Sequence, residues 1–141
     1  MNDFKKFQSD LKIYSKYEDV LALKLIKKYL LEPIYVKCTN KDFDIKLSND
    51  VTYELKCNPG AIRSNFVFVE FTSRGVESGI YSTKADFYVF CFDLKNFYSI
   101  PTNDLILMCM YNNYKIMTTR DKLTFGYLMP MDEFLSNSEL V

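Results

Sequence analysis

Two short segments of alternating polar and apolar residues flank a turn near the middle of the chain. Residues 42–47 and residues 51–57 alternate strictly, which is typical of strands with one buried face. Ser48-Asn49-Asp50 lies between them and consists of turn-forming residues. The pattern predicts an antiparallel β-hairpin whose register is fixed, because a slip of one residue would move every apolar side chain to the wrong face.

Other patterns surround this hairpin. Apolar residues at helical spacing predict a helix up to Leu31, with a break near Ser15, and Pro33 ends it. We further expect strands at 34–36, 65–71, 86–92 and 97–100, and strands or edge strands at 115–118 and 123–128. Further helices are expected at 102–112 and, as a short helix, from 130. A turn at 58–60, a polar connection at 74–79 and a frayed C-terminus complete the expected features. We expect strand 86–92 to be buried on both faces. The order of elements predicts an α/β (α+β) fold, and the 141 residues, without repeats or a linker, predict a single domain over 1–141.

Composition excludes several chemistries. The chain has no histidine, so Ser–His and Cys–His nucleophiles and His-ligated catalytic zinc are excluded. Its 18 basic and 18 acidic residues give no net charge, which counts mildly against a dedicated nonspecific DNA-binding protein but allows a local basic stripe beside an acidic pocket. The four cysteines form no CxxC pair, which argues against structural zinc and for a reducing, cytoplasmic setting. The charged N-terminus is unlike a signal peptide, and no apolar run is long enough to cross a bilayer.

The hairpin brings acidic residues together. With 48–50 as a three-residue turn, Asp44 lies directly opposite Glu54 and Asp42 lies opposite Lys56, at about 4.5–5.5 Å between Cβ atoms. Two facing carboxylates repel unless a cation neutralises them, and oxygen ligands suit Mg²⁺ or Mn²⁺. Such an ion polarises a phosphoryl oxygen, and a lysine orients the attacking water or stabilises the charge on the phosphate. The spacing thus outlines a site for phosphodiester hydrolysis, although alternating charge on a hairpin is also typical of a solvated face.

The same residues resemble a known signature. Asp44, followed on the next strand by Glu54 and Lys56 two positions apart, is similar to the motif of the PD-(D/E)XK nuclease superfamily, with Phe43 at the variable position of the nominal proline. The resemblance covers roughly residues 15–92. It implies a restriction-endonuclease-like αβββαβ core with a mixed central sheet flanked by helices. It also implies that Asp44 and Glu54 hold Mg²⁺ or Mn²⁺ and that Lys56 positions the attacking water.

A second stretch, residues 68–88, resembles the segment that follows this motif in small phage-type members of the superfamily. The likeness implies that Glu70 is an accessory metal-site residue and that Asp86 begins the next strand, where a structural cap is an equally good interpretation. A carboxylate among the apolar residues around Glu70 needs a partner or a metal. The loop beside the substrate would be shaped by Ser78, Gly79 and Thr83.

Three further residues complete the expected site. Resolvase-like members place a glutamate of the first helix near the metal, and Glu18 looks similar, although a capping box with Ser15 explains it equally well. Arg74 and Lys84 lie near loops beside the same face and would neutralise phosphate charge, which would make binding salt-dependent. Each of the two, taken singly, is also typical of an ordinary surface charge.

The resemblance therefore leads us to expect a Mg²⁺-dependent endonuclease that acts on DNA, including branched or structured DNA. A nuclease-like fold without catalysis, used to bind nucleic acid or protein, is the alternative. A third interpretation is a viral or plasmid-borne interaction protein with no nucleic-acid role. A homodimer is a family-based expectation, and no membrane association is expected.

Overall fold

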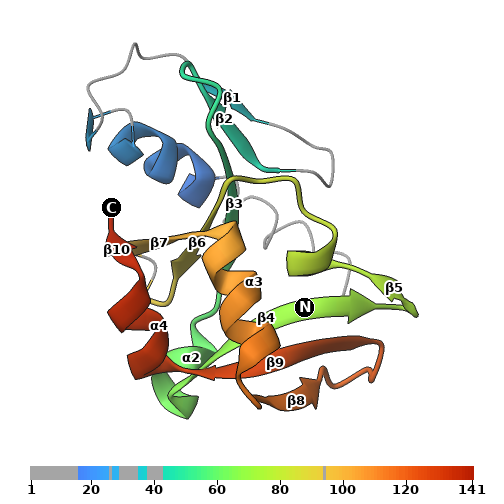
Figure 1. Cartoon of the computed structure of the whole chain (residues 1–141). Helices are drawn as coiled ribbons and strands as arrows, with labels where there is room; N and C mark the ends of the chain where they lie inside the picture. Colours follow the sequence, from blue (N-terminus) through green and yellow to red (C-terminus); the bar gives the residue numbers. More distant parts are fainter. Residues whose placement is uncertain (1–15, 26, 29–34, 38–42, 94) are drawn as a thin grey trace, which may run out of the picture.

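The computed structural model describes residues 16–25, 27–28, 35–37, 43–93 and 95–141, and these form two β-sheets with helices packed against them (Figure 1). The six-stranded sheet has the spatial order β1 (Tyr35–Lys37), β2 (Ile45–Leu47), β3 (Thr52–Cys57), β6 (Phe87–Cys91), β7 (Phe97–Pro101) and β10 (Glu139–Leu140). The four-stranded sheet has the order β5 (Val76–Glu77), β4 (Phe66–Ser73), β9 (Thr124–Pro130) and β8 (Lys115–Thr118). Neighbouring strands are antiparallel except β3 and β6, which are parallel, so the larger sheet is mixed.

Helices cover both faces of the larger sheet. The helical elements are residues 16–28 apart from 26, α2 (Gly60–Ser64), the 3₁₀ turn η1 (Gly79–Tyr81), α3 (Thr102–Tyr111) and α4 (Met131–Asn137). The first helix packs on one face, while α3, α4 and the smaller sheet lie on the other (Figure 1). The expected mixed α/β class is confirmed. None of the described helices combines the length and the apolar character needed to cross a membrane.

Strand β6 connects the two apolar clusters. Tyr88 and Phe90 point into the cluster shared with the smaller sheet, whereas Val89 and Cys91 point into the cluster under the first helix. All four side chains are buried. The expected strand with two buried faces is therefore confirmed, and it explains why this segment reads as a continuous apolar run.

The register of the hairpin agrees with the sequence-based calculation. Ile45 pairs with Tyr53, and the Leu47 N–H donates to the Val51 carbonyl at 3.0 Å. Asp50 takes a left-handed conformation with φ 68°, as the last residue of a three-residue hairpin loop commonly does. Alternation and turn chemistry together were enough to fix this pairing.

The prediction that Asp44 lies directly opposite Glu54 is wrong in detail. The Asp44 N–H donates to the Tyr53 carbonyl at 2.9 Å, and the Asp44 Oδ2 accepts a hydrogen bond from the Leu55 N–H at 2.8 Å. The side-chain carboxylate thus serves as the acceptor that a backbone carbonyl would supply in a regular ladder. Because the chain leaves the ladder here, β2 begins at Ile45 rather than at residue 42. Asp42, and with it the expected pairing to Lys56, lies outside the described residues.

The strand expected at 65–71 belongs to the smaller sheet. It forms β4, which pairs with β5 and β9 in the smaller sheet, while the edge of β3 is taken by β6. The physical reason lies in the expected turn at 58–60. There the chain enters helix α2 and leaves it through Asn65, whose φ of 64° redirects the chain away from the first sheet.

Four smaller expectations need correction or fall outside the described residues. The connection at 74–79 contains strand β5 and leads into η1 instead of being wholly irregular. The C-terminal residues do not fray, because β10 pairs with β7. The proposed helix break near Ser15 and the helix end at Leu31 lie outside the described residues.

Candidate active-site cleft

An open cleft with a volume of about 560 Å³ lies where the hairpin faces the smaller sheet. Its walls come from the hairpin, from β4 and from the segment between β5 and β6. The lining residues are Asp44, Glu54, Lys56, Glu70, Val76, Glu77, Ser78, Gly79, Ser82 and Thr83. The structure therefore gathers in one cleft most of the side chains that the sequence singled out, although they are widely separated along the chain.

Strand geometry sets the direction of the two central side chains. Glu54 and Lys56 are two positions apart on β3 and so share a face, and they are in register with Tyr88 and Phe90 of β6. Since Tyr88 and Phe90 face the smaller sheet, Glu54 and Lys56 do so too. The Lys56 Nζ lies 3.6 Å from the Glu54 Oε1, so the two charges form an ion pair at the cleft wall.

Glu70 reaches the cleft from the smaller sheet. The pairing of β4 with β9 shifts between Glu70 and Thr72, which marks a bulge in the strand. Bulges commonly re-aim a side chain near a functional site. Here the bulge lies beside the residue that brings a further carboxylate to the hairpin acids.

Burial raises the pKa values of both hairpin acids. Burial, followed by the negative charge of Asp44, raises the pKa of Glu54 from 4.5 to about 7, against the opposing effect of Lys56. Burial also raises the pKa of Asp44, although the Leu55 N–H and the Lys56 ammonium act in the opposite direction. Two partly buried carboxylates thus share a space in which one lysine does not fully compensate them. Binding of a proton or a cation would stabilise this pair, because either one neutralises negative charge.

The loop that forms the far wall packs tightly on β4. Gly79 has φ +54°, and a Cβ at this position would lie 2.1 Å from the Glu70 carbonyl oxygen. The Ser78 N–H donates to the Phe71 carbonyl at 3.0 Å, and the Thr83 N–H donates to the Gly79 carbonyl at 3.0 Å. The positive φ and the contact that a Cβ would make both require a glycine at position 79. The close approach of Gly79 and these hydrogen bonds hold the loop against the strand that carries Glu70.

Glu18 lies beside the cleft but is not part of its wall. It lines a neighbouring pocket of about 210 Å³ together with Leu55, Lys56 and Cys57. Its charge is close enough to contribute to the raised pKa of Glu54, after the larger effects of burial and Asp44. Its assignment as a metal ligand stays a prediction, and the capping box cannot be followed because Ser15 lies outside the described residues.

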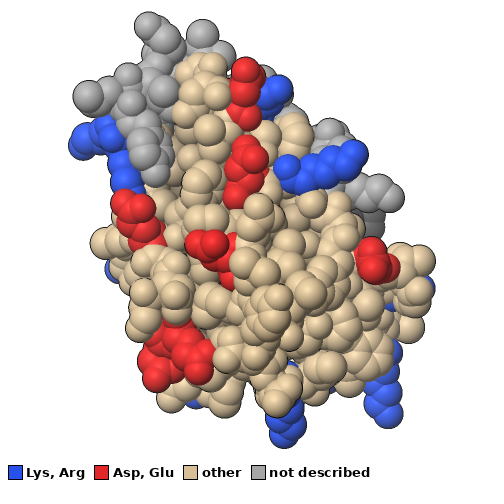
Figure 2. All heavy atoms as spheres, in the orientation of Figure 1, with Lys and Arg blue, Asp and Glu red and all other residues tan. Residues whose placement is uncertain are grey.

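Arg74 and Lys84, expected to bind substrate, are exposed and do not belong to the described residues that line the cleft. Arg74 lies in the turn between β4 and β5, where its N–H donates to the Leu123 carbonyl at 2.7 Å. On the face shown in Figure 2, Lys and Arg side chains lie mostly near the margins, while Asp and Glu are spread over the middle. This face of the described residues thus offers no continuous basic surface, and the role of Arg74 and Lys84 stays a prediction.

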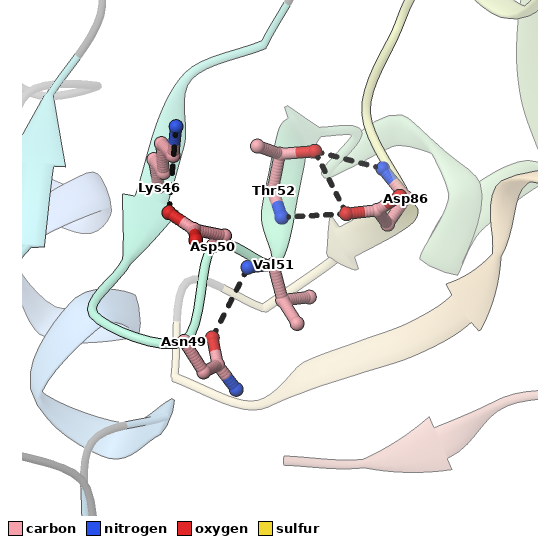
Figure 3. A network of polar contacts seen from close by, with 6 residues as sticks. All are labelled: Lys46, Asn49, Asp50, Val51, Thr52 and Asp86. Carbon is pink, nitrogen blue, oxygen red and sulfur yellow. Dashed lines mark hydrogen bonds and ion pairs between the residues drawn. The ribbon is translucent and has the colours of Figure 1, made fainter.

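Asp86 has a structural partner (Figure 3). Its Oδ2 accepts hydrogen bonds from the Thr52 N–H at 2.9 Å and from the Thr52 Oγ1 at 3.1 Å. The Asp86 N–H donates back to the Thr52 Oγ1 at 3.0 Å. On the other side, the Val51 N–H donates to the Asn49 Oδ1 at 3.1 Å. The contacts between Thr52 and Asp86 fasten the start of β3 to the segment entering β6, which supports the structural interpretation of Asp86.

Sequence reasoning missed Tyr88. Its side chain is only 2% exposed, and its hydroxyl lies close enough to the cleft carboxylates for them to affect its pKa. Nothing in the sequence distinguishes this tyrosine from its aromatic neighbours in a fully apolar strand. Only the pairing of β6 with β3 places it beside Glu54.

The donor set fits a hard divalent cation with few protein ligands. Among the described residues, no group of three or more His, Cys, Asp or Glu side chains is arranged to hold a metal ion. Mg²⁺ needs only one or two carboxylates, because it keeps several waters and takes substrate phosphate oxygens as further ligands. Asp44 and Glu54 supply oxygen ligands only. Both carboxyl groups have raised pKa values, and a bound cation would lower these values by favouring the ionised form.

Comparison with known proteins found no matching family model, no matching curated protein and no matching solved structure. The fold and the cleft define a mixed α/β protein with an acidic, lysine-containing cleft between two sheets.

Proposed function

We propose that the protein is a metal-dependent nuclease of the PD-(D/E)XK type that hydrolyses phosphodiester bonds in DNA. The observation that carries the proposal is the meeting of Asp44, Glu54 and Lys56 in one cleft, with Glu70 opposite them. Asp44 and Glu54 would hold Mg²⁺ or Mn²⁺. When bound, the cation would supply a Lewis acid for the phosphoryl oxygen and would neutralise the acids that otherwise repel phosphate.

The order of elements supports the proposed core. The first helix is followed by the antiparallel strands β1, β2 and β3, and the chain returns in β6 parallel to β3. This order of elements agrees with the αβββαβ pattern if the three consecutive strands are β1, β2 and β3, and not β2, β3 and β4. The returning connection here is long and also carries α2, β4 and β5.

The protein groups have separable tasks in this proposal. The Lys56 ammonium lies at the cleft wall, held near Glu54, where it can orient water or stabilise negative charge that builds on the phosphate. Glu70 is the additional carboxylate within the cleft. Ser78, Gly79 and Thr83 form the wall beside which the substrate backbone would lie.

The test is cleavage of supercoiled plasmid, branched DNA and single-stranded RNA, each with Mg²⁺, Mn²⁺ or EDTA. We expect metal-dependent cleavage of DNA that falls about 100-fold or more in Lys56→Ala and Glu54→Gln. Glu77→Gln is the matched control, because it removes an exposed charge from the rim of the same cleft. Equal cleavage by the wild type, Lys56→Ala and Glu54→Gln would dispose of the proposal.

A binding module with a nuclease-like fold is the second candidate. The zero net charge allows it, and the absence of a group of three metal-binding side chains among the described residues favours it over catalysis. Binding of DNA at low salt without cleavage in the presence of any metal would support this alternative.

Light scattering on the same samples tests the expected homodimer.

A further inference from the structure

The hydroxyl of Tyr88 is buried without a hydrogen-bond partner among the described residues. The side chain is 2% exposed and lies on the cleft-facing side of β6, in register with Glu54 on β3. Buried hydroxyl groups in folded proteins are nearly always hydrogen-bonded to protein or to ordered water. An unpaired phenol at this position therefore indicates a ligand or water that belongs beside it.

A side pocket of about 110 Å³ adjoins the cleft and contains Tyr88. Its walls are mainly apolar, with Phe68 and Phe90 among them, and it shares Lys56 and Glu70 with the cleft. This volume accommodates a few water molecules, each of which occupies about 30 Å³ in the liquid. The side pocket therefore has Tyr88 and Glu70 in its wall, and it shares Glu70 with the cleft that contains the hairpin acids.

The groups around this space are complementary to one water molecule. The Tyr88 hydroxyl has no hydrogen-bond partner among the described residues, so its O–H can donate a hydrogen bond to a water in this space. Glu70 offers carboxylate oxygens that accept hydrogen bonds. A water between them would accept one hydrogen bond from Tyr88 and donate one to Glu70, which leaves its second lone pair directed elsewhere.

We propose that Tyr88 and Glu70 position the water that attacks the phosphodiester, which leaves the Lys56 ammonium free to stabilise the phosphate. This inference rests on the proposed function. In the step, an O–H bond of the water breaks and its proton passes to the Glu70 carboxylate. The water oxygen forms the new bond to phosphorus, and the bond from phosphorus to the leaving sugar oxygen breaks with its electron pair on that oxygen, which takes a proton from solvent. Tyr88 is a positioning residue in this assignment.

Steady-state cleavage of a DNA duplex by Tyr88→Phe tests the inference. We expect kcat to fall about 10- to 100-fold with KM changed less than about 2-fold, since only the orientation of the water is lost. The melting temperature should not fall, because the deleted hydroxyl has no protein partner. Tyr98→Phe is the control, because it removes a hydroxyl from β7 that lines neither the cleft nor the side pocket. An unchanged kcat in Tyr88→Phe would overturn the inference.

Two further measurements separate positioning from a structural role. The double variant of Tyr88→Phe and Glu70→Gln should cleave no more slowly than Glu70→Gln alone, because both residues act on the same water. A high-resolution crystal structure should show a water bonded to the Tyr88 Oη and to Glu70, and this water should be lost in Tyr88→Phe. A direct bond from the Tyr88 hydroxyl to a carboxylate would overturn the inference. A wild-type protein that cleaves no nucleic acid would overturn the proposed function, while the crystal structure would still decide whether these residues hold a water.

Discussion

Replacing Glu54 with Gln tests the electrostatics of the cleft without any assumption about substrate. Its carboxylate is largely buried beside Asp44, and its pKa is raised from 4.5 to about 7. Below about pH 4.5 the group is protonated in both the folded and the unfolded chain, so it carries no penalty. As the pH rises from 4.5 to 7, the folded chain holds the proton more tightly than the unfolded chain, and the free energy of unfolding decreases. Above about pH 7 the loss is complete.

The size of the effect follows from the two pKa values. The interval from 4.5 to about 7 corresponds to about 3 kcal/mol. Because 15% of the Glu54 side chain is exposed, solvent screening reduces this value, and we expect about 2 kcal/mol. For a chain of this size that is roughly 4–8 °C in melting temperature. Glu54→Gln should therefore be more stable than the wild type at pH 8, by an amount that shrinks toward pH 4.5.

The assay is urea and thermal unfolding of the metal-free protein in EDTA between pH 5 and pH 8. Glu77→Gln serves as the control, because it removes an exposed charge on the same rim and should not change the pH dependence. Millimolar Mg²⁺ should then stabilise the wild type at pH 8 more than Glu54→Gln, since only the wild type keeps both acids. If the wild type and Glu54→Gln showed the same pH dependence in EDTA, the raised pKa of Glu54 in the cleft would be refuted.

Two substitutions test the framework around the cleft. Gly79→Ala should destabilise the protein by more than about 2 kcal/mol in a denaturant titration and reduce cleavage, because the new Cβ would lie 2.1 Å from the Glu70 carbonyl oxygen. Gly75 has φ +81° and nothing within 4 Å of an added Cβ. Gly75→Ala should therefore show only the backbone cost of about 1–2 kcal/mol in the same titration. Asp86→Ala should lower the free energy of unfolding by about 1–3 kcal/mol, because it leaves the buried Thr52 N–H and hydroxyl without their acceptor, and Asp86→Asn should recover part of the loss. Equal stability of the two alanine variants at 75 and 79, or no cost in Asp86→Ala, would contradict these contacts.

The sequence determined the local features of the site. Strict alternation and a three-residue turn are local signals, and they fixed the pairing of Ile45 with Tyr53. They also placed Glu54 and Lys56 on one face, since any strand puts residues two apart on the same side. The helix expected at 102–112 is confirmed as α3, Thr102–Tyr111, for the same reason, because helix boundaries depend on a few neighbouring residues.

Tertiary structure decided what those residues face. The Asp44 carboxylate bonds to the Leu55 N–H where the ladder ends, and no periodic pattern reports such a side-chain substitution for a backbone acceptor. The path through α2 sent β4 into a second sheet, and that placed Glu70 across the cleft from the hairpin. Tyr88 gained its position beside Glu54 only through the parallel pairing of β3 with β6. Contacts between segments far apart in the chain are set by global packing, and local residue order carries little information about them.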